Sequence, residues 1–255
     1  MSNIIYSRNY LNNVIFRIDF MSDEKLYEQM IQKNNIDELR KRFEILEPLQ
    51  KIKNTDFMIN VDENTLEQHN KETIKCVLRK KDQTATLTIE HDAIVINYVK
   101  YENSDILKED IKTLHILLKN VSITRIGLRY VNYIQNNVFG DIDWNLYINN
   151  DILCNHKVDY RGSLLQSITI TDIKYDDFII RFQHGIHNQN FPADRVQDAF
   201  VLDFDAYTND ISSDYNLENI VTKWNNQINY LFELSITDKF REVLNNEQSE
   251  LQLRQ

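Results

Sequence analysis

Alternation of apolar and polar residues, the pattern of half-buried β-strands, recurs along this sequence and restricts most strongly what the chain can fold into. In residues 14–20 every second residue is apolar, whereas Arg17 and Asp19 fall on the opposite face. A strand of this kind buries its apolar face only under a second layer of structure. The pattern therefore predicts a sheet that is covered on one side.

Short strand-like segments, most of them rich in β-branched residues, are separated by polar turns and predict antiparallel pairing. In the first half they span residues 57–61, 73–79, 85–90, 93–99 and 123–134. In the second half they span residues 144–148, 167–173, 178–183 and 199–207. Two of them, 167–173 and 178–183, flank the polar turn at residues 175–177 and are predicted to form a hairpin.

Helices are predicted between and after these strands. Ser22 is predicted to cap a first helix, and Asn35 with Glu38 has the spacing of a capping box for a second helix. One apolar stripe predicts a helix over residues 104–119, and another predicts a long helix that begins near Leu217.

The last long helix carries Trp224 within its apolar stripe. A large aromatic side chain suits the surface of a sheet better than the narrow seam of a coiled coil. We therefore expect this helix to pack on the sheet as part of the core. Residues 235–238 are expected to interrupt it before a further short helical stretch near Phe240.

These elements predict an α+β fold with a mixed, mostly antiparallel sheet and amphipathic helices on one face. The two halves share a rough order of strand, antiparallel strands and helix, which suggests two similar lobes, although no residue-level repeat is present. We expect an N-terminal α+β lobe (1–140) and a C-terminal α+β lobe (141–255), with one continuous domain as the alternative.

The formal net charge of −10 limits the partners that the chain can bind. Binding to nucleic acid or to an anionic membrane usually requires a basic face, so neither partner is expected for this chain by itself. The densest basic stretch, Lys75–Lys81, is interpreted as a solvated strand end and turn. The first residues lack the apolar run of a signal peptide, and no run approaches the roughly 18 apolar residues of a membrane span, so a cytoplasmic location is expected.

Cysteines and histidines form no complete metal or catalytic motif. Cys76 and Cys154 have neither CxxC nor zinc-finger spacing and are interpreted as small buried hydrophobic residues. His184 and His187 form an HxxH without a third ligand at a suitable spacing, so we expect no bound zinc. The sequence contains no P-loop, dinucleotide-binding, nucleophile-elbow or HExxH signature, which favours a protein without cofactor or catalytic residues.

The segment Arg125–Asn132, with the sequence RIGLRYVN, is the most distinctive in the chain. On a strand, Tyr130 and Asn132 would share one face and Arg129 the other. An arginine on a strand either clamps a phosphate or carboxylate ligand with paired hydrogen bonds or forms an ion pair with an acidic residue of a neighbouring strand. The sequence leaves both interpretations open.

Asp203 and Asp205 share one face of the predicted strand 199–207. Either carboxylate is the expected internal partner of Arg129, because an arginine in a half-buried strand needs a partner to offset its desolvation. Two carboxylates at this spacing also suit a magnesium ion, although no third acidic ligand is evident. The candidate ligand-binding residues are therefore Arg125, Arg129, Tyr130, Asn132, Asp203 and Asp205.

Three segments carry a resemblance to a known family: residues 125–132, the sequence LDFD at 202–205, and the ending from Trp224 to LFELSITD at 231–238. They resemble an uncharacterised family of sporadically distributed bacterial proteins that share a mid-chain GLRY-N segment. The resemblance covers nearly the whole chain and implies no activity. The family's patchy distribution implies genes that travel on mobile elements, where antiviral defence genes also cluster.

The leading hypothesis is a non-enzymatic binding or interaction protein, an accessory subunit of a bacterial antiviral-defence or mobile-element system. The alternative is a metal-dependent phosphate-processing enzyme that uses Asp203 and Asp205. The enzyme would need these carboxylates in an open cleft near a third acid, whereas a binding protein would have them paired or solvated. The expected partner is another protein or a small anionic ligand, and self-association is left open.

Overall fold

The computed structural model describes residues 6–60, 65–119, 121–136, 140–153, 161–211, 215–246 and 251–253, with the backbone alone for residues 52–60 and 65–72. Over these ranges the chain forms five α-helices and a ten-stranded sheet whose registered pairs are antiparallel. The predicted α+β fold is therefore confirmed.

The elements follow one another as strands with interspersed helices. The strands are β1 (Leu11–Phe20), β2 (Ile45–Leu46), β3 (Gln50–Asn60), β4 (Thr65–Arg79), β5 (Ala85–Ile89), β6 (Ala93–Tyr98), β7 (Ile123–Gln135), β8 (Ser167–Lys174), β9 (Ile179–Ile186) and β10 (Ala199–Thr208). The helices are α1 (Glu24–Met30), α2 (Lys33–Leu39), α3 (Ser104–Leu114), α4 (Leu217–Ser235) and α5 (Asp238–Leu244), with a 3₁₀ turn η1 (Trp144–Leu146).

Contacts within the chain define two compact units. The N-terminal unit comprises residues 15–99 and 105–126, and the C-terminal unit comprises residues 1–14, 100–104 and 127–255. Both units thus draw on separate stretches of the sequence. A boundary between two lobes at residue 140 stays a prediction.

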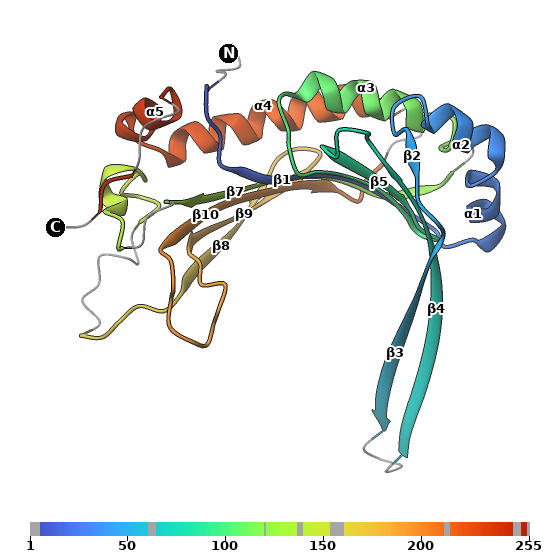
Figure 1. Ribbon diagram of the computed structural model, residues 1–255, viewed down its shortest axis with the longest axis horizontal. Coiled ribbons are helices and arrows are strands. Elements are labelled where there is room, and N and C mark those ends of the chain that lie inside the picture. Colours follow the sequence, from blue (N-terminus) through green and yellow to red (C-terminus); the bar gives the residue numbers. More distant parts are fainter. Residues whose placement is uncertain are drawn as a thin grey trace. The chain divides into compact units, whose positions relative to one another are not determined.

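The N-terminal unit contains the strand order β2-β4-β5-β6-β1 (Figure 1). The predicted alternation is present in β1, where Phe16 and Ile18 are fully buried and Arg17 and Asp19 are partly exposed. Helix α3 supplies the covering layer, because its apolar stripe is buried at Leu107, Ile111 and Leu114.

A buried carboxylate fixes α3 to the rest of the N-terminal unit. Asp110, which is fully buried, accepts hydrogen bonds from Arg42 Nε at 2.8 Å and from the Tyr98 hydroxyl at 2.6 Å. Its second ion pair is with Lys80, whose Nζ lies 2.6 Å from Oδ2. A buried carboxylate requires such partners to offset its desolvation, so this cluster has a structural role.

The C-terminal unit contains the strand order β7-β10-β9-β8, with α4 packed against β10 (Figure 1). Strands β8 and β9 pair antiparallel around residues 175–178, so the predicted hairpin is confirmed. Trp224 of α4 is buried, with its ring stacked on Phe178 at a centroid distance of 5.7 Å. The prediction that this helix belongs to the core is therefore confirmed.

The predicted strand at 144–148 is wrong, because Trp144–Leu146 forms a 3₁₀ turn. Trp144, Tyr147 and Ile148 are the buried residues here, which is helical spacing rather than alternation. The Trp144 indole Nε1 donates to Asp198 at 3.0 Å, and this bond holds the turn in place.

Several predicted helix ends also differ from the structure. Asp23 rather than Ser22 caps α1, with its side chain accepting from the backbone N–H groups of Lys25 and Leu26. Asn35 lies inside α2 rather than at its start, and its amide donates to the Gln29 carbonyl at 2.9 Å. The helix predicted over 104–119 ends at Leu114.

Candidate functional site

A row of charged residues crosses the solvent-facing side of the sheet in the C-terminal unit. On β10, alternation buries Leu202, Phe204 and Ala206 on the core side and turns Asp203 and Asp205 to the opposite side. Phe204 stacks on its register partner Phe182 at 4.6 Å, which fixes the core side of β9 as well. We call the opposite side the charged face, and it is formed by Arg129, Asp172, Arg181, Asp203 and Asp205.

Arg129 and Asp203 form a two-bond ion pair at the centre of the charged face. Arg129 Nε donates to Oδ1 of Asp203 at 2.8 Å, and Nη2 donates to Oδ2 at 2.5 Å. Hydrogen bonding to Asp203 raises the pKa of the Arg129 guanidinium, against the opposing effect of burial. The predicted internal partner of Arg129 is thus confirmed as Asp203, while 45% of the arginine side chain remains exposed.

A second two-bond ion pair lies beside the first. Arg181 Nε and Nη2 donate to the two carboxylate oxygens of Asp172 at 2.8 and 3.0 Å. Hydrogen bonding to Arg181 lowers the pKa of Asp172 and in turn raises the pKa of Arg181. Arg181 is the register partner of Asp172 on β8 and of Asp205 on β10, so the three residues form one transverse row.

Asp172 and Arg181 of this row were not among the predicted site residues, whereas Asp205 was, and the sequence contains a signal for the missed pair. A hairpin that turns at residues 175–178 places residues 172 and 181 opposite each other. The predicted hairpin could therefore have identified this cross-strand pair. The alignment of this pair with Asp205 requires the pairing of β9 with β10, and no local sequence pattern indicates that pairing.

The other predicted site residues lie elsewhere. Tyr130 is buried on the core side, where its hydroxyl donates to Asn225 Oδ1 at 2.9 Å and lies 3.0 Å from the Tyr101 hydroxyl. Burial raises the pKa of Tyr130. Asn132 is also buried and donates through Nδ2 to the Leu202 carbonyl at 3.2 Å. Both side chains thus bind protein groups, and a contact of either with a ligand stays a prediction.

Arg125 belongs to the N-terminal unit rather than to the C-terminal unit that holds Arg129. Its Nη1 lies 3.4 Å from Oδ2 of Asp19, and Arg17 Nε donates to Oδ1 of the same aspartate at 2.6 Å. Asp19 therefore pairs with two arginines, and the proposed role of Arg125 toward a ligand stays a prediction.

A metal ion at Asp203 and Asp205 would have to compete with Arg129 for the Asp203 carboxylate. Both oxygens of Asp203 accept hydrogen bonds from Arg129, so a cation would have to displace the guanidinium. Among the described residues, no group of three or more histidine, cysteine, aspartate or glutamate side chains is arranged to hold a metal ion. His184 is buried on β9, and His187 follows that strand with its Nδ1 3.5 Å from the Tyr133 hydroxyl.

Gly185, between these histidines, lies within β9. Its φ is +141°, and a Cβ at this position would lie 1.9 Å from the Ser167 carbonyl oxygen of β8. Only glycine allows this backbone conformation and this close approach of the neighbouring strand. The glycine therefore extends the hairpin rather than ending it.

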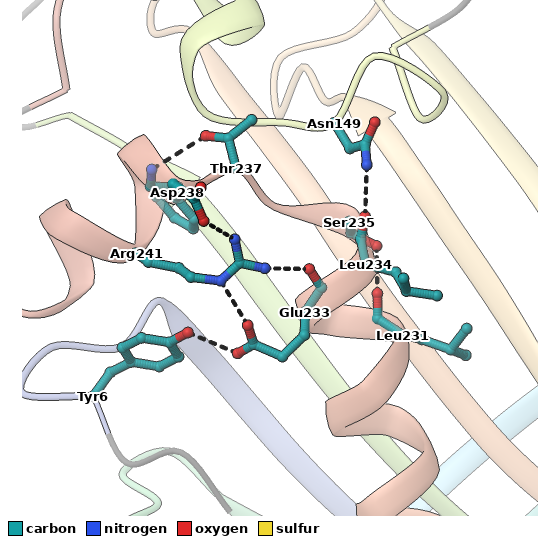
Figure 2. Close-up of polar contacts among 10 residues, drawn as sticks. Tyr6, Asn149, Leu231, Glu233, Leu234, Ser235, Thr237, Asp238 and Arg241 are labelled. Carbon is teal, nitrogen blue, oxygen red and sulfur yellow. Dashed lines mark hydrogen bonds and ion pairs between the residues drawn. The ribbon is translucent and has the colours of Figure 1, made fainter.

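The final sequence motif, residues 231–238, spans the junction between α4 and α5 (Figure 2). Glu233 accepts hydrogen bonds from the Tyr6 hydroxyl at 2.7 Å and from Arg241 Nε at 2.8 Å. Arg241 also donates to Asp238 at 2.8 Å and to the Glu233 carbonyl at 2.6 Å. Thr237 caps α5 by accepting from the Phe240 N–H, which confirms that the helix is interrupted and capped again here.

A shallow polar pocket of about 330 Å³ lies at this junction, between residues 145–150 and 236–241. Its polar groups already bind protein atoms, since Asn149 Nδ2 donates to the Leu234 carbonyl and Thr237 Oγ1 donates to the Leu146 carbonyl. The three hydrogen bonds of Arg241 likewise end on protein oxygens. The motif thus stabilises the junction, and the charged face is the better candidate for binding.

Cys76 is buried, as predicted, and burial raises the pKa of its thiol to about 11. Such a thiol is a poor nucleophile near neutral pH. Cys154 lies outside the described residues.

Comparison of this chain with protein-family models and with curated proteins found no match. None of the described helices has the length and hydrophobicity required to cross a membrane.

Proposed function

We propose that this chain is a non-enzymatic binding protein and that the charged face is its recognition surface. The observation that carries the proposal is the pair of two-bond arginine–aspartate contacts, Arg129 with Asp203 and Arg181 with Asp172, side by side on one sheet face. These contacts hold the guanidinium groups in fixed orientations before a partner arrives. A fixed orientation lowers the entropic cost of binding.

The exposure of these side chains supports their availability to a partner. About half of the side chain remains exposed in Arg181 (50%) and in Asp172 (49%). The charged face presents positive arginines beside negative aspartates. Such a surface suits another protein better than a small anion, because the adjacent carboxylates would repel an anion. Charge patterns of this kind contribute to the choice of partner and to the association rate.

The alternative, a metal-dependent phosphate-processing enzyme at Asp203 and Asp205, is less well supported. Such an enzyme needs open carboxylates near a third acid. Asp203 is instead buried under Arg129. The geometry therefore favours binding.

The proposed biological setting is the cytoplasm of a bacterium, where the protein would act as an accessory subunit of an antiviral-defence or mobile-element system. The basis for this setting is the resemblance of residues 125–132 and 231–238 to the sporadically distributed bacterial family. Membership of that family is itself part of the proposal.

The test exchanges the two charges of the outer ion pair. The double variant Arg181→Asp with Asp172→Arg preserves an ion pair between β8 and β9 but reverses the charges that a partner meets. Tagged wild-type and variant chains are purified from cells of the source organism, and the co-purified proteins are quantified by mass spectrometry. We expect the variant to remain folded, with a small loss of stability because the introduced carboxylate faces Asp205, while the main partner is depleted about tenfold or more.

The matched control is the same kind of exchange on α5, where Lys239 and Glu242 form an exposed ion pair at 2.8 Å. The double variant Lys239→Glu with Glu242→Lys should retain the partner. Undiminished recovery of the partner by the β8–β9 exchange would show that the charged face is not the recognition surface.

A further inference from the structure

Strand β8 forms one edge of the sheet, because it is last in the strand order and, among the described strands, pairs with β9 alone (Figure 1). None of its residues, Ser167–Lys174, is buried. Its core-side register partners on β9 are buried, namely Ile180, Phe182 and His184. Burial on the core side of the sheet therefore stops at β9.

The register of the β8–β9 pair identifies the backbone groups that point away from β9. In an antiparallel pair, residues that bond to the neighbouring strand alternate with residues whose N–H and C=O point to the other side. The Tyr175 N–H donates to the Phe178 carbonyl at 2.8 Å, so these two residues form a bonded pair. Counting back along the register, the residues that turn their backbone groups to the open edge are Ile170, Asp172 and Lys174.

Strand β8 lacks most of the features that protect an exposed edge from another strand. Such edges are commonly very short, interrupted by proline or marked by charged side chains. β8 has eight residues, is mostly β-branched and contains no proline. Its one carboxylate, Asp172, is paired with Arg181, and its one lysine, Lys174, lies at the end of the strand. The edge is therefore suited to recognition by strand addition.

The side chains along this edge specify the chemistry of an added strand. Asp205, Arg181 and Asp172 form a transverse row in which negative and positive charges alternate, so the next position in the row favours lysine or arginine. Ile170 and Lys174 share the face of Asp172. Ile170 is 58% exposed and favours an apolar residue opposite it, whereas Lys174 favours a carboxylate.

We propose that the partner of the charged face contributes an extended segment, which adds to β8 as an antiparallel strand. Antiparallel pairing continues the pattern of this sheet and is slightly the more stable arrangement. Because the added strand runs opposite to β8, its alternate residues are a carboxylate opposite Lys174, lysine or arginine opposite Asp172, and an apolar residue opposite Ile170. This inference rests on the proposed function, since Asp172 belongs to both.

A second copy of β8 fits this pattern poorly. Matching Asp172 with Lys174 in both directions would place Asp176 of the second copy opposite Ile170. Asp176 also lies in the turn after β8, so such a ladder would be short. Each copy further carries a net charge of −10, which opposes self-association.

The first experiment measures the binding of a labelled synthetic peptide, TETKTIT, to the full-length chain by fluorescence anisotropy. N-methylation of its glutamate, lysine and isoleucine amides removes the N–H groups that would bond to β8, whereas N-methylation of the intervening threonine amides is the matched control. We expect the first change to weaken binding about tenfold or more and the second to leave most of it. Failure of TETKTIT to bind, or equal losses for the two methylated peptides, would overturn strand addition.

The second experiment alters the edge of the chain itself. Ile170→Pro blocks the edge without removing a bond to β9, because the N–H of residue 170 points away from that strand. We expect a chain that remains folded by circular dichroism and binds TETKTIT about tenfold or more weakly. The Lys239→Glu with Glu242→Lys exchange on α5 is the control and should bind the peptide as the wild type does. Undiminished binding by Ile170→Pro would contradict the proposal.

The charge exchange Arg181→Asp with Asp172→Arg tests the register of the added strand. The central lysine of the peptide would then face an arginine, so the exchanged chain should prefer TETETIT, whereas the wild type prefers TETKTIT. An unchanged preference would reject the predicted register. Sedimentation velocity tests the other occupant, because a wild-type dimer that Ile170→Pro dissociates would identify a second copy at this edge and overturn the proposal.

Co-purification from cells distinguishes this inference from the proposed function. If the charge exchange loses the main partner while Ile170→Pro retains it, strand addition is rejected and the charged face stands as the recognition surface. If Ile170→Pro loses the partner while the charge exchange retains it, recognition by the charged face is rejected and the β8 edge remains the attachment point.

Discussion

Arg129 is the residue whose environment carries most of the binding proposal. Its partner Asp203 is buried, whereas the arginine side chain as a whole is about half exposed. Removing the arginine would leave a carboxylate with little access to water and without its two hydrogen bonds. Arg181 differs from Arg129 because its partner Asp172 is itself exposed.

Replacement of Arg129 by alanine should therefore destabilise the protein by about 1–3 kcal/mol, the cost of leaving a buried charged group without its partner in a site that water partly reaches. Arg129→Lys should be intermediate, since lysine keeps the charge but not the paired geometry. Urea denaturation measures both. Arg181→Ala is the control and should leave the midpoint nearly unchanged; equal losses in the two alanine variants would contradict the structural role of Arg129.

Cys76 should make unfolding depend on pH in the alkaline range. The folded state raises the pKa of this thiol from an ordinary value near 9 to about 11, so the folded protein holds the proton more tightly than the unfolded chain. The resulting stabilisation is complete below pH about 9 and is lost as the pH rises through about 11, with a total of at most about 3 kcal/mol.

The measurement compares urea unfolding of the wild type and Cys76→Ala at about pH 8 and about pH 10. Other groups titrate in both chains, so the difference between them isolates the thiol. The wild type should lose more stability than the variant over this interval. Parallel pH profiles would show that the thiol has the same pKa in the folded and unfolded states.

At the scale of elements, α4 packs against β10 and the β8–β9 hairpin in the C-terminal unit. The helix buries Leu217, Val221, Trp224 and Ile228 along one stripe, and Trp224 stacks on Phe178. The Tyr130–Asn225 hydrogen bond adds a polar contact between β7 and the same helix. Burial of this stripe supplies much of the hydrophobic stabilisation of the unit.

Trp224→Ala should consequently cost about 3–5 kcal/mol, the usual effect of truncating a buried large aromatic residue. Tyr230→Ala on the same helix is the matched control, because Tyr230 is exposed and should tolerate the change. Thermal or urea unfolding followed by circular dichroism gives both values. A chain lacking residues from Leu217 onward should not fold; a folded truncated chain that only loses self-association would mean that α4 is a dimerisation helix.

At the scale of the whole molecule, an acidic chain combines an ion-paired sheet face with a long two-stranded hairpin, β3–β4. Under the binding proposal, the ion-paired face serves contact with another protein rather than the activation of a substrate. Asp203 and Asp205 are the carboxylates that a metal-dependent enzyme would use. In the structure, both oxygens of Asp203 are bound to Arg129. The enzyme alternative makes a distinct prediction about metal content.

We expect the purified full-length chain to contain neither zinc nor any other divalent metal in stoichiometric amount. For zinc the reason is the incomplete HxxH of His184 and His187, and for magnesium it is the competition of Arg129 for Asp203. Elemental analysis of protein prepared without chelator measures both. One equivalent of metal per chain that Asp203→Asn removes would support the enzyme alternative.

Local periodicity by itself determined a large part of this fold. The alternation in residues 14–20, the β8–β9 hairpin and the apolar stripe around Trp224 each depend on neighbours within a few residues, and each is present in the structure. The ion pair of Arg129 was predicted to within two candidates, because Asp203 and Asp205 share one face of a strand that the sequence indicates. Periodicities over a few residues indicate which side chains share a face of a strand or helix. The backbone geometry of the element fixes which side chains these are.

The tertiary structure alone decided which faces meet. The choice of Asp203 for Arg129 joins residues 74 positions apart, and it requires β7 to lie beside β10. The row through Arg181 and Asp205 requires the β9–β10 register, and the burial of Asp110 requires α3 to close over Arg42 and Lys80. The length of the β3–β4 hairpin escaped prediction, because it is set by the pairing of the two strands rather than by a local pattern. Long-range pairing is selected by the combined free energy of many contacts, so no short stretch of sequence contains the information that specifies it.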